Sequence, residues 1–199
     1  MKHRLLWCAI LIAFSTSAKA QSIGFGVQGD IVNFNFAGDL KEVYSLGYGG
    51  GAHVDFHLGF LGLRLSGDYL LLTPDAAKLA QITGAVPGVT IDGLKITAIS
   101  GNLNLKVPVI PLPVVSIYAT GGGGVVYLKA TDATVFYQGA QVTTVPAPDP
   151  QTKAALNAGA GADFKLGGVT LFAELKINWI LTEGETSTMV PLGTLGITF

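Results

Sequence analysis

An unbroken alternation of apolar and polar side chains between Val169 and Trp179 is the feature that most constrains the fold. Successive side chains of a β-strand point to opposite faces of a sheet, so this segment is predicted to be a strand. In a soluble β-sandwich its leucines would be buried. In a membrane barrel they would face lipid, and the polar residues would line the interior. The side on which the leucines lie therefore decides the class of protein.

The first twenty residues have the pattern of a secretory signal peptide. A basic start precedes an apolar run at 5–14, and small residues lead to Ala20, after which cleavage is expected. The run is shorter than the roughly 20 residues that a membrane-spanning helix needs. We therefore predict a signal peptide at 1–20 and a mature chain at 21–199, which has no cysteine because Cys8 is the only one.

Few charges remain in the mature chain. The whole sequence has 12 basic and 13 acidic residues, and three of the basic ones lie in the expected signal peptide. The mature chain is therefore acidic, which argues against a nucleic-acid partner. Only 13% of all residues are charged, against about a quarter in ordinary soluble domains, and the mean hydropathy is +0.51. This composition suits a barrel in lipid better than a soluble surface.

Eight long strands are predicted from this kind of pattern. Most exceed the mean strand of soluble proteins, about 5 to 6 residues, and match the roughly 9 to 11 tilted residues that cross a bilayer. The predicted strands cover 22–34, 43–58, 63–72, 93–107, 115–130, 153–166, 169–181 and 189–199. They predict an all-β fold, an eight-stranded antiparallel transmembrane up-and-down β-barrel.

Short turns and longer loops alternate between these strands, as they do in outer-membrane barrels. The turns are 59–62, 108–114 and 167–168, and the longer loops are 35–42, 73–92, 131–152 and 182–188. With an even number of strands, both chain ends are expected on the short-turn, periplasmic side. We also expect a helical turn after Thr73, with Pro74 at its first helical position, and a hairpin inside 131–152.

The expected turns predict how strands pair. If Leu166 lies opposite Val169 across the Gly167–Gly168 turn, the polar residues of both strands fall on one face. The same alternation predicts Gly196 opposite Glu174 in the last strand. Across the turn at 59–62 it predicts three pairs: His57 with Arg64, Asp55 with Ser66 and His53 with Asp68.

The inward face is therefore predicted to be polar. Its expected network consists of Asp30, His53, Asp55, His57, Arg64, Asp68, Lys106, Asp163, Lys165, Glu174, Lys176 and Asn178. Such a network could plug the barrel or form a gated filter, or these groups could pair simply because the interior is cramped. An eight-strand barrel is only just wide enough for its side chains, so we expect a filled lumen with little open pore.

The outward face is predicted to be apolar, with aromatic girdles at both membrane interfaces. The expected members are Phe25, Phe56, Phe164 and Phe199 near the short turns, and Tyr44, Tyr48, Tyr127 and Trp179 near the long loops. The alternation slips around Ala98 to Ser100, where we predict a β-bulge.

The pattern favours neither catalysis nor a bound metal. His53 and His57 share a face, but residues four apart on a strand stand about 13 Å from each other, too far to ligate one ion. They lie near the periplasmic end, so no general base is expected beside an external substrate. We predict no enzyme activity, no cofactor and no metal site.

The glycine runs at 47–52, 120–125 and 158–162 are expected to make room inside for Tyr118, Glu174 and Lys176. Alternatively, they could leave a small cavity, around Tyr118, Gly122 and Gly124, or a lateral opening for an apolar molecule.

The final residues, PLGTLGITF, place Leu195, Ile197 and Phe199 at alternate positions. This ending resembles the signal that the barrel-assembly machinery recognises in Gram-negative outer-membrane proteins. With the signal peptide, eight strands and polar interior, the mature chain resembles the small-barrel family typified by the OmpA transmembrane domain and OmpX, the outer-membrane-protein beta-barrel domain. A weaker likeness is to OmpW. The resemblance implies a monomer in the cell outer membrane, in contact with membrane lipid and lipopolysaccharide. The sequence departs from OmpA in that no peptidoglycan-binding domain is expected after Phe199, so no cell-wall tether is expected.

These inferences predict a structural or surface-interaction role, carried by the loops at 73–92 and 131–152 on a rigid barrel. The first alternative is a narrow channel or lateral conduit for small or apolar solutes, as in OmpW. The second is a secreted soluble β-sandwich or lipocalin-like carrier, which would bury Leu171, Leu175 and Trp179.

Overall fold

The computed structural model describes residues 21–33, 41–82, 84, 87–182 and 188–199. The predicted signal peptide at 1–20 and most of the predicted loops at 35–42 and 182–188 lie outside these residues. The barrel strands are β1 (Gln21–Asn33), β2 (Tyr44–Leu58), β3 (Leu61–Pro74), β5 (Ile96–Pro111), β6 (Val115–Ala130), β9 (Gln151–Leu166), β10 (Val169–Ile180) and β11 (Thr188–Thr198). The other elements are α2 (Ala76–Ile82), β4 (Val89–Gly93), β7 (Ala133–Tyr137) and β8 (Ala140–Val145).

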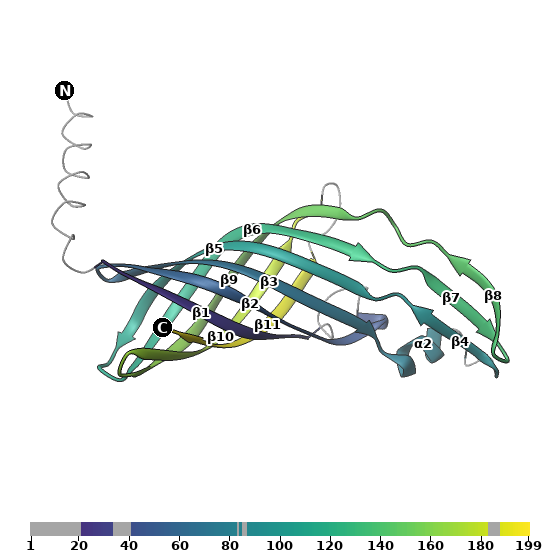
Figure 1. Ribbon diagram of the computed structural model, residues 1–199, viewed down its shortest axis with the longest axis horizontal. Coiled ribbons are helices and arrows are strands. Elements are labelled where there is room, and N and C mark those ends of the chain that lie inside the picture. Colours follow the sequence, from purple (N-terminus) through teal and green to yellow (C-terminus); the bar gives the residue numbers. More distant parts are fainter. Residues whose placement is uncertain (1–20, 34–40, 83, 85–86, 183–187) are drawn as a thin grey trace, which may run out of the picture.

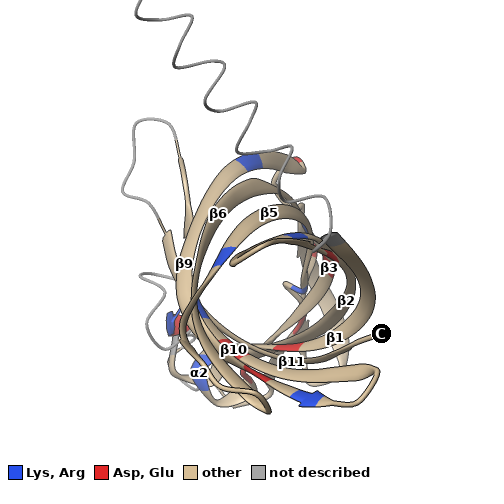
Figure 2. Ribbon diagram, turned by 90° about the vertical axis from the view of Figure 1, so that its left-hand side faces the viewer, with Lys and Arg blue, Asp and Glu red and all other residues tan. Residues whose placement is uncertain are grey.

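The barrel strands form one closed antiparallel sheet (Figures 1 and 2). Neighbours along the chain pair with each other, and β1 pairs with β11 to close the ring. The C-terminus lies at the end of the barrel where the short turns are, as predicted (Figure 1). The prediction of an eight-stranded antiparallel up-and-down barrel is confirmed.

The strands are staggered around the barrel. Paired residues followed from Asp30 through β2, β3 and β5 lead to Leu128 of β6. Followed the other way, through β11, β10 and β9, they lead to Tyr118 of the same strand, ten residues away. A stagger of this kind tilts the strands by roughly 35–45° to the barrel axis. With eight strands, the interior is a space that side chains can fill.

Two tight turns set the register of two hairpins. Leu58 pairs with Leu61 and Leu166 pairs with Val169, so each connecting loop has two residues. The first loop residue, Gly59 or Gly167, has a φ of 66° or 68°, a left-handed conformation that glycine adopts readily. The predicted register between β9 and β10 is confirmed.

Register differs from the prediction at the first of these turns. The prediction took 59–62 as a four-residue loop, whereas the tight turn at Gly59 shifts the pairing by two residues. As a result, Arg64 lies opposite Asp55 instead of His57, and Ser66 lies opposite His53. The correction matters because it brings a guanidinium and a carboxylate directly together.

The last strand is also shifted by two residues from the prediction. Glu174 pairs with Thr194, and the residue opposite Gly196 is Phe172. A Cβ placed on Gly196 would lie 2.5 Å from the Phe172 ring, so the largest inward side chain of β10 occupies the space that this glycine leaves. Packing of the Phe172 ring over Gly196 explains the register between β10 and β11. The alternation of inward and outward residues could not predict it, because a shift by two residues leaves every side chain on the same face.

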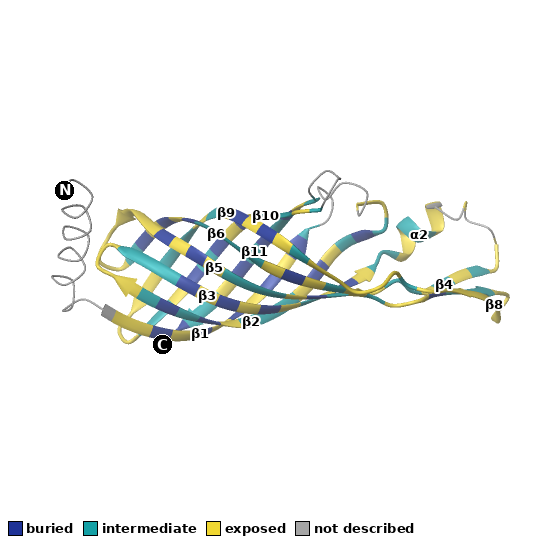
Figure 3. Cartoon of the chain, turned by 90° about the horizontal axis from the view of Figure 1, so that it is seen from above, coloured by how far each residue is buried: buried dark blue, intermediate teal, exposed yellow. Residues whose placement is uncertain are grey.

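Exposure alternates along the barrel strands (Figure 3). The leucines of the segment from Val169 to Trp179 point outward: Leu175 is 73% exposed, whereas the neighbouring Glu174 is 3% exposed. This polarity is the reverse of that in a soluble carrier, and it suits an apolar surrounding. Among the described residues, no helix is both long enough and apolar enough to pass through a membrane.

A second sheet prolongs the barrel wall beyond the long-loop end (Figure 1). It has the order β4-β7-β8, and these strands adjoin β5, β6 and β9 in the chain. The main chain stays paired at the junction, where the Thr131 N–H donates to the Lys95 carbonyl at 2.9 Å. We call this sheet the arm. The predicted hairpin inside 131–152 is confirmed as β7 and β8.

The helix predicted after Thr73 is also present, with a different start. Pro74 ends β3, and Asp75 caps α2 by accepting hydrogen bonds from the Ala77 N–H at 2.9 Å and the Lys78 N–H at 3.4 Å. The Ser45 hydroxyl also donates to Asp75, at 2.6 Å. That bond and then the two backbone bonds lower the pKa of the Asp75 carboxyl. The cap therefore ties α2 to the start of β2.

Candidate functional site

A bidentate ion pair lies inside the half of the barrel nearest the short turns. Arg64 Nε and Nη2 each donate to one oxygen of Asp55, both at 2.7 Å. The guanidinium carbon stands 4.0 Å from the centroid of the Phe172 ring, a cation–π contact. Both charged side chains are almost fully buried. The corrected register of β2 and β3 is what makes this pair possible.

A second ionic group joins β6 to β10. Lys176 Nζ lies 2.7 Å from Glu174 Oε1, and the Tyr118 hydroxyl donates to Glu174 Oε2 at 2.9 Å. The part of the barrel wall next to these groups carries glycines, which make room for them, as predicted from the glycine runs. A Cβ on Gly161 would lie 2.5 Å from the Tyr118 hydroxyl oxygen, and one on Gly159 would lie 2.8 Å from Lys176 Cγ. The absence of a side chain at these two positions gives the large inward groups their space.

A third ion pair connects β5 with β9. Lys106 Nζ lies 3.1 Å from Asp163 Oδ1, and the same ammonium stands 4.1 Å from the centroid of the Tyr118 ring. Because Tyr118 also bonds to Glu174, the second and third ionic groups share a side chain. The charges of the lumen are thus packed against aromatic rings and against one another.

The remaining carboxylates of the lumen accept hydrogen bonds from neutral groups. Asp68 accepts from Gln28 Nε2 at 2.5 Å, and Ser66, Ser100 and Asn102 lie at 3.3–3.4 Å from its other oxygen. Asp30 accepts from the Thr194 hydroxyl at 2.6 Å. His53 Nε2 lies 2.9 Å from Thr198 Oγ1, and its ring meets Phe172 edge-on.

Three members of the predicted lumen network lie elsewhere. His57 and Lys165 are exposed at the short-turn rim, because each is close to the end of its strand. Asn178 is only partly buried and pairs with Asn157 across β9. The prediction also left out buried inward residues that the same parity rule identifies: Gln28, Ser66, Asn104, Thr120, Asn157 and Phe172. The predicted network was drawn mainly from charged residues and histidines, so it omitted most of the neutral inward side chains.

The lumen is apolar in its other half, toward the long loops. One buried cluster consists of Val32, Tyr44, Leu72, Val190 and Leu192, and a second consists of Ala98, Val126 and Ala155. Leu70 and Ile180 are partly buried and pack against both clusters. We call these residues the apolar layer. It covers the ionic half of the lumen on the side of the arm.

The apolar layer corrects two predictions. The predicted bulge at Ala98 to Ser100 is wrong, because β5 pairs with β3 and β6 there without a shift. Ala98 simply continues the inward face, which has become apolar. The assignment of Tyr44 to the outer aromatic girdle is also wrong. The pairing of β2 with β3 shifts between Tyr44 and Gly47, which turns the ring inward, and its hydroxyl donates to the Leu94 carbonyl.

The glycine-rich part of β6 has its inner space filled. A Cβ on Gly124 would lie 2.8 Å from Asn102 Oδ1, and Gly122 is covered in the same way by Asn104. Asn102 and Asn104 therefore fill the space beside these glycines, where the alternative prediction placed a small cavity. The outward aromatic residues of the girdles are exposed at Phe25, Tyr48, Tyr127, Phe164 and Phe199 and partly buried at Phe56 and Trp179.

Comparisons with known proteins identify a family for this sequence and several solved structures that are similar to it. The sequence matches the family described as outer membrane protein beta-barrel domain over residues 6–189. No curated protein matches it. The fold is similar to the N-terminal β-barrel domain of Pseudomonas aeruginosa OprF, with 12% identity over 90% of this chain and 99% of that chain and a TM-score of 0.48.

Two further solved structures are similar at the level of fold. Neisserial surface protein A is 16% identical over 89% of this chain and 97% of its own, with a TM-score of 0.47. Ail, the attachment invasion locus protein of Yersinia pestis, is 16% identical over 89% of this chain and 95% of its own, with a TM-score of 0.44. Since the family match covers most of the chain, the protein belongs to the outer membrane protein beta-barrel domain family and is located in the outer membrane of Gram-negative bacteria.

Proposed function

We propose that this outer-membrane barrel is a rigid base that presents the arm and the segment at 73–92 to molecules outside the cell. The observation that carries the proposal is the arm itself, which continues three strands of the barrel wall well beyond the rest of the molecule (Figure 1). Recognition is usually built on loops and projections held by a rigid scaffold. A barrel that served only to strengthen the membrane would not need such a projection.

The two faces of the arm differ in chemistry. The pairing of β4, β7 and β8 places mainly apolar residues on one face: Val89, Ile91, Ala133, Val135, Tyr137, Ala140 and Val145. The opposite face carries mainly polar residues, Thr90, Asp92, Thr134, Gln141 and Thr144, together with Phe136. On the apolar face, Tyr137 and Val145 are about half exposed, Val89, Ile91 and Val135 are partly buried, and Ala133 is buried. Apolar groups gathered on a surface outside the membrane support a role in binding a macromolecule.

The edge of the arm offers main-chain groups as well. β8 lies at the edge of its sheet, all six of its residues are exposed, and none of them is charged. Proteins commonly protect free edges with charged residues, and an unprotected edge can accept an added strand. The partner supported by these features is a protein that contributes apolar side chains and an extended segment.

Adhesion of cells that express the protein tests this proposal. Changing Val89, Ile91 and Tyr137 to threonine should reduce attachment to a surface coated with a serum-protein mixture at least tenfold, because it removes the apolar face. The matched control changes Thr90, Thr134 and Thr144 on the other face to alanine and should attach like the wild type. Equal attachment by both variants would refute the role of the arm, provided that both show the heat-dependent gel shift of a folded barrel.

We also propose that the lumen is closed. The three ion pairs in one half and the apolar layer in the other support a barrel filled by side chains, as an eight-strand barrel permits. The purified protein is expected to give no steady current in a planar lipid bilayer, and Lys176→Ala is expected to stay silent. A steady wild-type conductance that changes in Lys176→Ala or Glu174→Ala would instead support the alternative of a narrow channel.

A further inference from the structure

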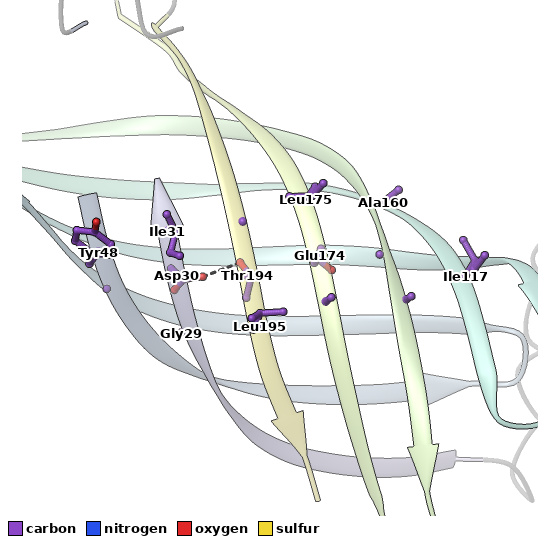
Figure 4. Close-up of a pocket in the computed structure, with 15 residues that line it drawn as sticks. Gly29, Asp30, Ile31, Tyr48, Ile117, Ala160, Glu174, Leu175, Thr194 and Leu195 are labelled. Carbon is purple, nitrogen blue, oxygen red and sulfur yellow. Dashed lines mark hydrogen bonds between the residues drawn. The ribbon is translucent and has the colours of Figure 1, made fainter. Parts of the chain in front are cut away.

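A trough of about 850 Å³ crosses the outside of the barrel wall (Figure 4). Its floor follows one row of paired residues on the inward-facing parity of the strands: Gly49, Asp30, Thr194, Glu174 and Gly161. The side chains of Asp30, Thr194 and Glu174 point into the lumen, and the two glycines have none. The outside of that row is therefore bare main chain. The trough and the ionic network are opposite faces of the same stretch of wall.

The sides of the trough are formed by the outward residues on either side of that row. One side has Ile31, Tyr48, Leu175, Gly193 and Ala160, and the other has Gly29, Leu195, Ala173, Ala162 and Ile117. Where these residues are glycine or alanine the sides are low, and where they are leucine, isoleucine or tyrosine the sides are high. A Cβ on Gly29 would meet no atom within 4 Å, and one on Gly193 would meet only ordinary contacts, so the space above both is open.

The trough has a direction relative to the membrane. Tyr48 lies near the start of β2, at the long-loop end, and Ile117 lies near the start of β6, at the short-turn end. It crosses β2, β1, β11, β10, β9 and β6, five spacings of about 4.8 Å, or about 24 Å in all. Because the row runs across strands that are tilted by about 35–45° to the barrel axis, its depth along the membrane normal is about 14–17 Å. The trough therefore runs from the outer interface through about half of the roughly 30 Å hydrocarbon layer, the thickness of one leaflet.

The surroundings of the trough identify what can occupy it. Every side chain that points outward along it is uncharged, and most are apolar. It is continuous with the lipid-facing wall of the barrel, so its occupant comes from within the bilayer. A second barrel presents a convex wall, which touches another convex wall along a narrow strip and cannot follow a trough over six strands. A flexible hydrocarbon chain can.

We propose that the trough binds one acyl chain of an outer-leaflet lipid, with the lipid headgroup at the Tyr48 end. Tyr48 is exposed and carries the only hydroxyl among the outward residues that line the trough. At the outer interface, this hydroxyl can donate a hydrogen bond to a phosphate or ester oxygen of the lipid. At the other end, Ile117 and Ala162 offer no polar side chain. The outer leaflet of a Gram-negative outer membrane supplies lipid A, which goes beyond the surface-binding role proposed for the arm.

Filling the trough tests the proposal. In the double variant Gly29→Leu/Gly193→Leu, two side chains would stand in its open middle without straining the backbone. The matched control is Gly101→Leu on β5, where an added side chain also meets no atom within 4 Å and which does not line the trough. Each protein is refolded in mild detergent, mixed with either lipid A or a palmitoyl-oleoyl phosphatidylethanolamine, and examined by native mass spectrometry.

The wild type and Gly101→Leu are expected to retain one lipid A at least tenfold more than the double variant does. Phosphatidylethanolamine should be retained less by the wild type. Equal lipid A retention by all three proteins, or a preference of the wild type for phosphatidylethanolamine, would overturn the proposal. So would a wild-type dimer that the double variant loses, since that would assign the trough to a second copy. The heat-dependent gel shift of each variant confirms that the barrel has folded before retention is compared.

Discussion

Replacing Arg64 with methionine is expected to lower the free energy of unfolding by about 3 to 5 kcal/mol. The substitution keeps an unbranched side chain of similar length in the lumen but removes both hydrogen bonds to Asp55 and the contact with the Phe172 ring. A carboxylate would then be buried without its partner, which is the costly part of breaking such a pair. Urea titration of the protein in lipid vesicles, followed by gel mobility, measures the change.

The double variant Arg64→Met/Asp55→Leu separates the cost of the orphaned charge from the loss of packing. It is expected to recover most of the lost stability, because replacing both partners of a buried pair with apolar groups is often close to neutral. Lys165→Met serves as the control, since Lys165 is exposed at the rim. A loss below about 1 kcal/mol for Arg64→Met would mean that the lumen is open enough for water to solvate Asp55.

Placing arginine at Leu175 is expected to cost about 2 to 4 kcal/mol, the penalty for a basic residue on the lipid face of a barrel near the middle of the bilayer. Leu175 is 73% exposed and lies in the middle of β10, far from both interfaces. In a protein surrounded by water, the same exchange at so exposed a position would be nearly neutral. The measurement is the urea midpoint in vesicles.

Val142→Arg is the matched control for Leu175→Arg. Val142 is also highly exposed but lies on β8 in the arm, beyond the barrel wall. Its substitution should leave the free energy of unfolding within about 0.5 kcal/mol of the wild-type value. Equal effects at the two positions would contradict the placement of the barrel wall in lipid and the arm in water.

Prediction of strand pairing succeeded at one of the two tight turns and failed at the other, where 59–62 was taken as a longer loop. The two glycines at 167–168 leave little choice for the pairing of β9 with β10, so that register could be derived from sequence. Between β10 and β11 no tight turn restricts the choice, and shifts by two residues preserve which face each side chain takes. The ring of Phe172 over Gly196 makes that choice, and it is a contact between side chains that sequence alone does not rank.

The inward face was harder to predict than the outward one. Outward residues all meet the same apolar medium, so one rule describes Leu175, Leu195 and Phe25 alike. Inward residues contact only one another. They can pack as polar groups that form hydrogen bonds and ion pairs, or as apolar groups that form a hydrophobic cluster. Ala98 therefore looked out of phase in sequence, although it belongs to the apolar layer. Tyr44 was misassigned for a related reason, since an irregularity in β2 reverses its direction.

Local patterns along the chain are enough to predict that it crosses a membrane as eight strands, with apolar side chains outward. Alternation, strand length and scarcity of charge all act locally, and the surrounding lipid imposes the same requirement on every strand. The contact of Arg64 with Asp55, the apolar half of the lumen and the continuation of three strands into an arm became known only from the three-dimensional structure. Those features depend on register and on packing between residues far apart in the chain, which no single strand encodes.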